Sequence, residues 1–262
     1  MPKAGFRAPL LGSIKGRKVE LKYPDDFYKT ADFGGRGIGS GTAAEDAELK
    51  LFRSHLEETL EKAGTSSIKV LCGKKLINVA GIITTQQTTS RAPKADFDLI
   101  DVDGNSVGWI SHKAGRQAKD FQQYGGLSDP VFNVPDVKKF MKDVSNMAPN
   151  GLVSGQSFLR PVKDTTVARR SIYGNNYGQA YGIQNVSEFH LGHMRLDKRG
   201  NSYIINSVHR GDNGALENTG DFQTVYFIRY GDRVARAAGE VVQKARVGVF
   251  ARGKAVRTTV EI

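Results

Sequence analysis

Two short stretches of this 262-residue chain carry side chains whose types and spacing suit metal and phosphate chemistry. Asp96 and Asp98 occur in "ADFDLIDV", and Ser111 and Lys113 occur in "WISHK". Residues two apart on a strand point to the same face, so each pair shares one side of its strand. Carboxylate oxygens are ligands for hard cations such as Mg²⁺, and an ammonium group beside them can act on a phosphate or a water.

A hairpin is the element that would bring these two pairs together. Asp103-Gly104 is a strong turn signal between apolar, β-branched runs over residues 96–102 and 106–113. Charged side chains within a sheet are costly unless they pair or bind a metal. The pattern therefore predicts a functional site on the hairpin rather than an ordinary surface hairpin.

A long amphipathic helix is predicted over residues 42–64. Thr42 and Glu45 have the spacing of a capping box, and Gly64 is a stop signal. One apolar stripe repeats at helical spacing and consists of Leu49, Phe52, Leu56 and Leu60. Glu45 projects onto this stripe. Two interpretations stay open for it: it closes the capping box at a wet helix end, or it faces an active site.

The remaining pattern indicates an α/β protein. Strands are predicted over residues 68–72 and 75–85, and a polar helical segment over 115–126 would place Asp120 and Tyr124 on one face. A further helix is predicted from Asp136, and the chain beyond Pro149 is mostly β. We expect an extended basic arm with a Gly-rich loop (1–41), an α/β core (42–150) and a β-rich, Arg-rich part (151–262) packed on that core.

The formal net charge of +11 favours a polyanionic partner, above all nucleic acid. Arginine dominates the basic side chains after residue 150, and it suits phosphate and base-edge contacts, while tyrosine can stack on bases. The alternatives are that the charge only maintains solubility and that the tyrosines close a packed loop. The candidate nucleic-acid contacts are Arg169, Arg170, Tyr173, Tyr177, Arg229, Arg233, Arg246 and Arg252.

Composition argues against several other classes of protein. The single cysteine, Cys72, lies in an apolar run and is expected in the core, so neither a disulfide framework nor a cysteine zinc site is predicted. His190 and His193 would face opposite sides of a strand, which disfavours a zinc site with His209. No apolar run is long enough to span a membrane. We expect a cytoplasmic protein, including the case of a phage-infected host.

The order of these residues resembles the PD-(D/E)XK, or restriction-endonuclease-like, nuclease superfamily over roughly residues 42–125. The counterparts of its motif are the helix with Glu45 and Glu48, then Asp96 in "PKAD", then Lys113 in "ISHK". The resemblance implies a core of a helix, a mixed central β-sheet and a second helix, here with a β-rich C-terminal extension. It also implies a Mg²⁺ (or Mn²⁺) cofactor.

The sequence departs from this pattern at Ser111, where the superfamily usually has Glu or Asp. A neutral hydroxyl is a poor substitute for a carboxylate ligand. The resemblance therefore implies a catalytic set of Asp96, Lys113, Ser111 and Glu45. The candidate metal ligands are Asp96, Glu45, Asp98 and Asp120.

The leading functional expectation is a metal-dependent DNA endonuclease of the restriction-like type found in bacteria and phages. Double-strand cutting would favour a symmetric homodimer. The second hypothesis is a catalytically impaired, nuclease-fold DNA-binding protein of a phage, with a packaging, replication or inhibitor role. The third is a basic structural protein of a viral or ribonucleoprotein assembly.

Overall fold

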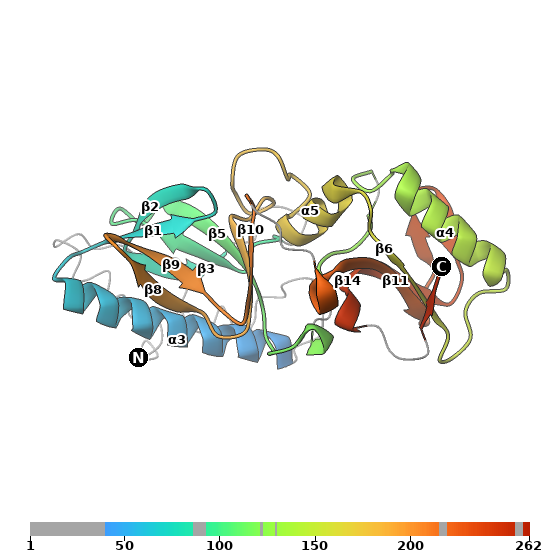
Figure 1. The fold of residues 1–262 in the computed structure, drawn as a ribbon, viewed down its shortest axis with the longest axis horizontal. Coiled ribbons are helices and arrows are strands. Elements are labelled where there is room, and N and C mark those ends of the chain that lie inside the picture. The colour runs from blue at the N-terminus through green and yellow to red at the C-terminus, as the bar shows by residue number, and fades with distance from the viewer. Residues whose placement is uncertain (1–39, 86–92, 121–122, 129, 215–218, 255–258) are drawn as a thin grey trace, which may run out of the picture. The chain divides into compact units, whose positions relative to one another are not determined.

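The computed structural model describes residues 40–85, 93–120, 123–128, 130–214, 219–254 and 259–262. Contacts divide the chain into two compact units (Figure 1). Unit 1 consists of Met1–Ala114 and Gly178–Leu216, and unit 2 consists of Gly115–Tyr177 and Glu217–Ile262. Nearly all of the predicted basic arm, residues 1–39, lies outside the described residues.

Helix α3 (Ser40–Ala63) confirms the predicted amphipathic helix of unit 1. Its apolar stripe is buried, and Gly64 ends it with a backbone φ of +61°, a left-handed conformation that glycine adopts without strain. The helix begins two residues before Thr42. Glu45 therefore lies in the second turn and not at the third helical position that a capping box requires.

Two sheets complete unit 1. The first has the strand order β2-β1-β9-β8, comprising Lys75–Val79, Ile68–Cys72, Ser202–Asn206 and Arg195–Arg199. The second has the order β10-β7-β5-β4-β3, comprising His209–Asp212, Glu188–Leu191, Ser106–Lys113, Phe97–Ile100 and Gly81–Thr84. In this second sheet β5 and β7 run parallel and the other neighbours run antiparallel, so the sheet is mixed, as expected.

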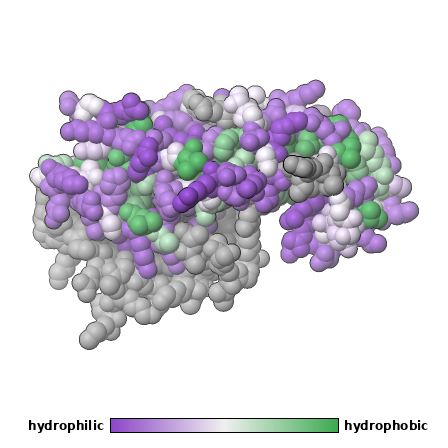
Figure 2. Space-filling view, turned by 60° about the horizontal axis from the view of Figure 1, so that its bottom comes forward, coloured by the Kyte–Doolittle hydropathy of each residue, from purple (hydrophilic) through white to green (hydrophobic). Residues whose placement is uncertain are grey.

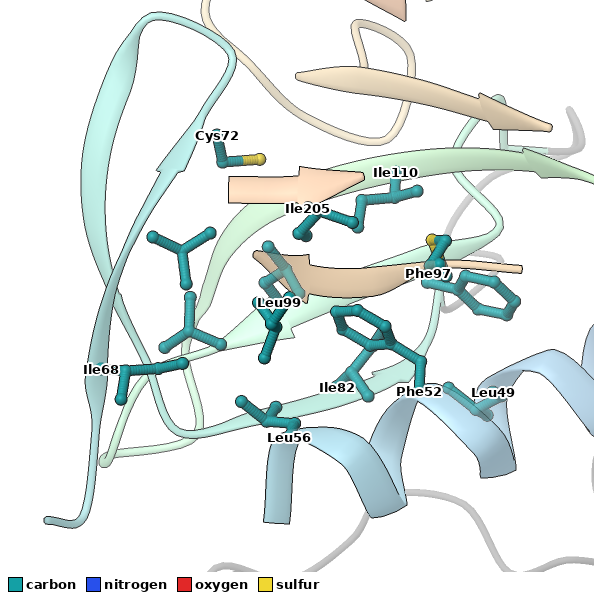
Figure 3. Packing of buried hydrophobic residues seen from close by; sticks show 14 of the residues in the cluster. Leu49, Phe52, Leu56, Ile68, Cys72, Ile82, Phe97, Leu99, Ile110 and Ile205 are labelled. Carbon is teal, nitrogen blue, oxygen red and sulfur yellow. The ribbon is translucent and has the colours of Figure 1, made fainter. Parts of the chain in front are cut away.

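The core of unit 1 lies between the two sheets and α3 (Figure 3). Phe52 and Leu56 of the helix pack with Leu99 of β4 and Ile110 of β5, and all four are essentially inaccessible to solvent. Cys72 is buried in the same cluster, as predicted from its apolar run. The predicted hairpin is present as β4 and β5. The described part of unit 1 contains no second α-helix, so the expected helix on the other side of the sheet is not found there.

The division into units differs from the predicted boundary near residue 150. Strand β7 pairs in parallel with β5, and β9 pairs in parallel with β1, so residues 178–216 return to unit 1. These pairings join segments far apart in the chain, which local patterns do not reveal. Within this returning segment, β8 pairs antiparallel with β9 in the first sheet, and β7 pairs antiparallel with β10 in the second.

Unit 2 is built on a four-stranded sheet with the order β14-β11-β6-β15, comprising Ala245–Ala251, Thr224–Tyr230, Ser157–Pro161 and Val260–Glu261. A small ribbon of β12 and β13, Ala235–Ala237 and Glu240–Val242, contacts α4 (Pro135–Met147), which confirms the helix predicted from Asp136. Helix α5 (Thr165–Tyr173) begins at Asp164, whose carboxylate accepts two backbone N–H groups.

The helix predicted after Lys113 is wrong for the described residues, which form only a 3-10 turn at Ala118–Asp120. The Asp120 carboxylate accepts the backbone N–H groups of Arg116 and Gln117, each at 2.9 Å. Such local side-chain bonds favour a turn over a helix. Tyr124 is buried and its hydroxyl donates to the carbonyl of Phe222, so it forms no helical face with Asp120.

The surface in Figure 2 is mostly hydrophilic, with small and separate hydrophobic areas among the coloured residues. None of the helices in the described ranges has the length and apolar character that crossing a membrane requires.

Candidate active site

Asp96 is the centre of a compact polar cluster at the end of strand β5. It stands directly before β4, and its backbone N–H donates to the carbonyl of Ile110, which extends the β4–β5 pairing by one residue. One carboxylate oxygen, Oδ2, accepts the backbone N–H of His112 at 2.6 Å and the hydroxyl of Ser111 at 3.2 Å. The hairpin therefore positions Asp96 through both backbone and side-chain bonds.

Lys113 completes this cluster. Its Nζ lies 3.2 Å from Asp96 Oδ2 and donates to the carbonyl of His112 at 2.6 Å. The side chains of Lys113 and Asp96 are 26% and 20% exposed to solvent. A ligand can therefore reach them, while the surrounding sheet limits their motion. We call Asp96, Ser111 and Lys113 the hairpin cluster. The structure thus brings together three of the four residues of the expected catalytic set.

Asp98 has a different environment, although it was predicted on the same face. It is 6% exposed, and its two carboxylate oxygens accept the hydroxyls of Thr85 and Ser106. These bonds satisfy a buried carboxylate within the sheet.

The buried carboxylate of α3 belongs to Glu48, whereas Glu45 is half-buried. Glu48 Oε1 accepts the backbone N–H of Met194 at 2.6 Å, and Oε2 lies 2.7 Å from His193 Nδ1. The helical projection missed this because the segment between β7 and β8 covers a second flank of the helix. The signal that identifies Glu48 is its i,i+4 spacing from Phe52, which extends the buried arc.

His112 lies on the opposite face of β5 from the hairpin cluster. Burial lowers its pKa to about 4, although the carboxylates of Glu48 and Asp96 act in the opposite direction. A neutral ring has one N–H, and Nε2 lies 3.1 Å from the carbonyl of Gly192, which accepts it. His112 therefore ties the end of β5 to the residue that follows β7.

Lys94 lies two residues before Asp96, and the charges of both Asp96 and Lys113 act on it. Burial lowers its pKa to about 7, the positive charge of Lys113 adds to this effect, and Asp96 opposes it. A lysine whose pKa is lower in the folded than in the unfolded protein binds fewer protons when folded. Stability therefore rises with pH between the folded and the unfolded pKa values.

We expect Lys94→Met to raise the unfolding temperature by a few degrees at pH 6.5 and by less at pH 9.5. The desolvation penalty of the ammonium is complete below pH 7 and disappears as the pH approaches the unfolded pKa near 10.4. Thermal unfolding of both proteins at both pH values measures the difference, and other pH effects are common to the two. A gain that is equal at both pH values, or larger at pH 9.5, would contradict this account.

The donor set at the hairpin cluster fits an open Mg²⁺ site and not a closed metal cage. Among the described residues, no group of three or more His, Cys, Asp or Glu side chains is arranged to hold a metal ion. The oxygens that do gather are those of the Asp96 carboxylate, the Ser111 hydroxyl and the His112 carbonyl. Mg²⁺ is commonly bound through one or two carboxylates, with waters and substrate phosphates as the other ligands.

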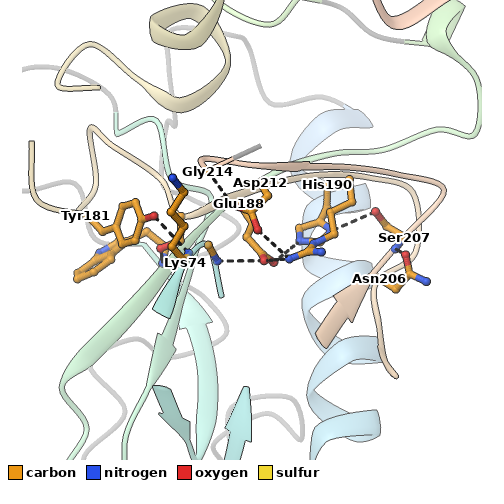
Figure 4. Close-up of polar contacts among 12 residues, drawn as sticks. Lys74, Tyr181, Glu188, His190, Asn206, Ser207, Asp212 and Gly214 are labelled. Atoms are coloured by element: carbon orange, nitrogen blue, oxygen red, sulfur yellow. Dashed lines mark hydrogen bonds and ion pairs between the residues drawn. The ribbon is translucent and has the colours of Figure 1, made fainter. Parts of the chain in front are cut away.

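A second polar network lies inside unit 1 and includes His190, one of the three histidines for which zinc binding was considered (Figure 4). Glu188 is fully buried, accepts the backbone N–H of Gly73 at 3.1 Å and pairs with Arg210. Its other oxygen lies 3.0 Å from His190 Nε2. Burial alone would raise the pKa of Glu188, but bonding to His190 and Arg210 lowers it. His190 therefore belongs to a structural ion-pair network.

The four candidate nucleic-acid residues of α5 and the following turn contact one another or the body of unit 2. Arg170 donates to the carbonyl of Val131 at 3.0 Å, and Tyr173 is fully buried. Arg169 contacts the hydroxyl of Tyr177 and lies 5.5 Å from the centre of its ring. The burial of Tyr173 matches the alternative in which the tyrosines close a packed loop.

Strands β11 and β14 of unit 2 expose two arginines side by side. Arg229 and Arg246 are direct partners in the antiparallel register and both are exposed, and Arg233 is exposed just beyond β11. Like charges at directly opposite positions destabilise a sheet unless an anion binds there. Arg252, by contrast, is paired with Glu261.

Comparison with curated proteins finds the type II restriction enzyme CviJI of Paramecium bursaria Chlorella virus IL3A. It is 32% identical to this chain over 146 residues, which cover 52% of this chain and 40% of that enzyme. The chain therefore spans less than half the length of this relative. No family model and no solved structure matches the chain.

Proposed function

We propose that this chain is a restriction-like DNA endonuclease that hydrolyses phosphodiester bonds with Mg²⁺ (or Mn²⁺). The observation that carries the proposal is the hairpin cluster, in which Asp96 and Lys113 are 3.2 Å apart at a partly exposed strand end. The similarity to a type II restriction enzyme supports the same class of reaction, and the net charge of +11 suits a DNA substrate.

Asp96 would hold the metal ion, with Glu45 as the candidate for a second carboxylate. When bound, Mg²⁺ would supply positive charge to the scissile phosphate and make water more acidic. Lys113 donates hydrogen bonds from a fixed place, where its ammonium can orient the attacking water and stabilise the negative charge that develops on the phosphate. Ser111 contributes a buried hydroxyl that holds the Asp96 carboxylate in its orientation.

The proposed metal ligands do not include Asp98 and Asp120, which the sequence also suggested as ligands. Both oxygens of Asp98 accept hydroxyl groups inside the sheet. Asp120 uses its carboxylate to hold its own turn, in which Arg116 and Gln117 supply the N–H groups. A metal ion would compete with these bonds at both oxygens of Asp98 and at Oδ2 of Asp120.

Phosphate binding by unit 2 is proposed for Arg229, Arg233 and Arg246. Two exposed, directly opposed arginines would be neutralised by a phosphate between them. Tyr173 is left out because its ring is fully buried.

A second candidate function rests on Ser111. With a neutral hydroxyl where a carboxylate would strengthen metal binding, the chain would bind DNA without cutting it, as a catalytically impaired nuclease-fold protein of a phage. The third candidate is a basic structural protein that neither binds nor cuts DNA in this way.

Plasmid cleavage separates these functions. The purified full chain is incubated with supercoiled plasmid in Mg²⁺, in Mn²⁺ and in EDTA, and DNA retardation is measured on a gel at increasing salt. We expect nicked or linear plasmid with the metal ions and intact plasmid with EDTA. Retardation without cutting would favour the DNA-binding protein, and the absence of both effects would favour the structural protein.

A further inference from the structure

Glu48 and His193 form a pair of the kind that orients an imidazole for proton transfer. The Glu48 side chain is 4% exposed, and its Oε2 lies 2.7 Å from His193 Nδ1. The other oxygen, Oε1, accepts the backbone N–H of Met194 at 2.6 Å, so the carboxylate cannot rotate freely. Its acceptor role fixes a proton on His193 Nδ1. The second ring nitrogen, Nε2, belongs to a side chain that is 72% exposed and can meet a ligand.

The backbone places this pair at the same strand end as the hairpin cluster. Lys113 and Leu191 are direct partners in the parallel pairing of β5 and β7. The next residue, Gly192, donates its N–H to the carbonyl of Lys113 at 2.9 Å and accepts from the His112 ring at 3.1 Å. His193 follows Gly192 directly. Four bonds from β5 and α3 therefore hold the segment that presents His193.

We propose that His193 is the general acid that protonates the leaving oxygen during DNA cleavage, with Glu48 as its positioning residue. The inference rests on the proposed nuclease function, in which Asp96 would hold the metal ion and Lys113 would orient the attacking water and stabilise the charge on the phosphate. That assignment leaves the leaving oxygen without a proton donor. A donor that a buried carboxylate holds in place, in the segment whose backbone bonds the carbonyl of Lys113, would fill this role.

The water oxygen forms a bond to phosphorus, and the bond from phosphorus to the bridging oxygen breaks. That bridging oxygen takes the Nε2 proton of the doubly protonated His193 imidazolium and leaves as a hydroxyl group. The water loses its proton to solvent, and the imidazole regains one from solvent. During the step the Nδ1 proton stays on the hydrogen bond to Glu48.

The test compares His193→Gln with wild type on three duplexes in single-turnover experiments with Mg²⁺. One duplex is ordinary DNA, one has sulfur in place of the bridging 3′ oxygen at the cleavage site, and one has sulfur in place of the bridging 5′ oxygen. A thiolate leaves without protonation. We expect His193→Gln to cut ordinary DNA roughly 100-fold more slowly than wild type. The defect should disappear on one of the sulfur duplexes, which also identifies the leaving atom.

His55→Gln is the matched control. His55 also bonds from α3 to the β7–β8 region, through the backbone N–H of Leu196 at 3.4 Å, but it lies two helical turns from Glu48. It should cut all three duplexes as wild type does. Glu48→Gln should show the pattern of His193→Gln in a milder form, and fluorescence of the single tryptophan, Trp109, checks that unit 1 is folded.

Three outcomes overturn the inference or the function beneath it. If His193→Gln cuts ordinary DNA at the wild-type rate, His193 is not the acid although the nuclease function stands. If its defect is equal on all three duplexes, its role is binding or structure and not proton transfer. If wild type cuts none of the duplexes, the proposed function itself fails.

Discussion

Replacing Lys113 by alanine is expected to lower the rate of DNA cleavage by about 10²- to 10³-fold, which is the usual cost of removing one fixed donor to a developing charge. The Nζ atom lies 3.2 Å from Asp96 Oδ2 and 2.6 Å from the His112 carbonyl, so its position does not depend on the substrate. The variant should bind DNA nearly as well as wild type. Single-turnover cleavage and gel retardation measure the two properties separately.

Lys69→Ala is the control for this variant. Lys69 is exposed on β1, and its removal lowers the net charge by the same amount. Any general weakening of DNA binding by the lost charge therefore appears in both variants and is reduced at higher salt. Cleavage by Lys113→Ala that is as fast as cleavage by Lys69→Ala would contradict the role given to Lys113.

The second large effect is on stability. Glu188→Gln is expected to reduce the free energy of unfolding of unit 1 by about 3 kcal/mol, the lower end of the range for breaking a buried ion pair. Glu188 is fully buried, and the change removes the charge that balances Arg210 and bonds His190 (Figure 4). Arg210 keeps its contact with Asp212 at 3.3 Å, which limits the loss.

Urea unfolding followed by tryptophan fluorescence measures this effect. Trp109 is the single tryptophan and lies on β5, so its signal reports unit 1 alone. Asp212→Asn is the comparison, because its side chain is 20% exposed and water can replace the lost interaction. We expect a clearly smaller loss there. Equal losses in the two variants would show that burial of Glu188 does not determine its contribution.

Local sequence patterns were sufficient to predict the hairpin cluster and helix α3. The Asp103-Gly104 turn and the alternation on either side specify which residues oppose one another, so Asp96 and Lys113 could be placed together from the sequence. The apolar repeat of the helix predicted its buried face in the same way. These features depend on neighbours a few residues apart.

Features that depend on distant segments could not be predicted in this way. Glu48 is buried because Met194 and His193 cover its flank of the helix; its spacing from Phe52 indicates the flank, but nothing near it in the sequence indicates the segment that covers it. The parallel pairing of β5 with β7 likewise joins residues of one sheet across the whole of the 115–177 segment. After Lys113, the carboxylate of Asp120 favoured a turn where polarity alone suggested a helix.

The most direct test of the proposed catalytic centre is cleavage of supercoiled plasmid in Mg²⁺ by wild type and by Asp96→Asn, which keeps the shape of the side chain and removes its charge. We predict that wild type cuts the plasmid, that EDTA stops the reaction, and that Asp96→Asn retards the DNA on a gel but does not cut it. Cutting by Asp96→Asn at the wild-type rate, or no cutting by wild type, would contradict the account.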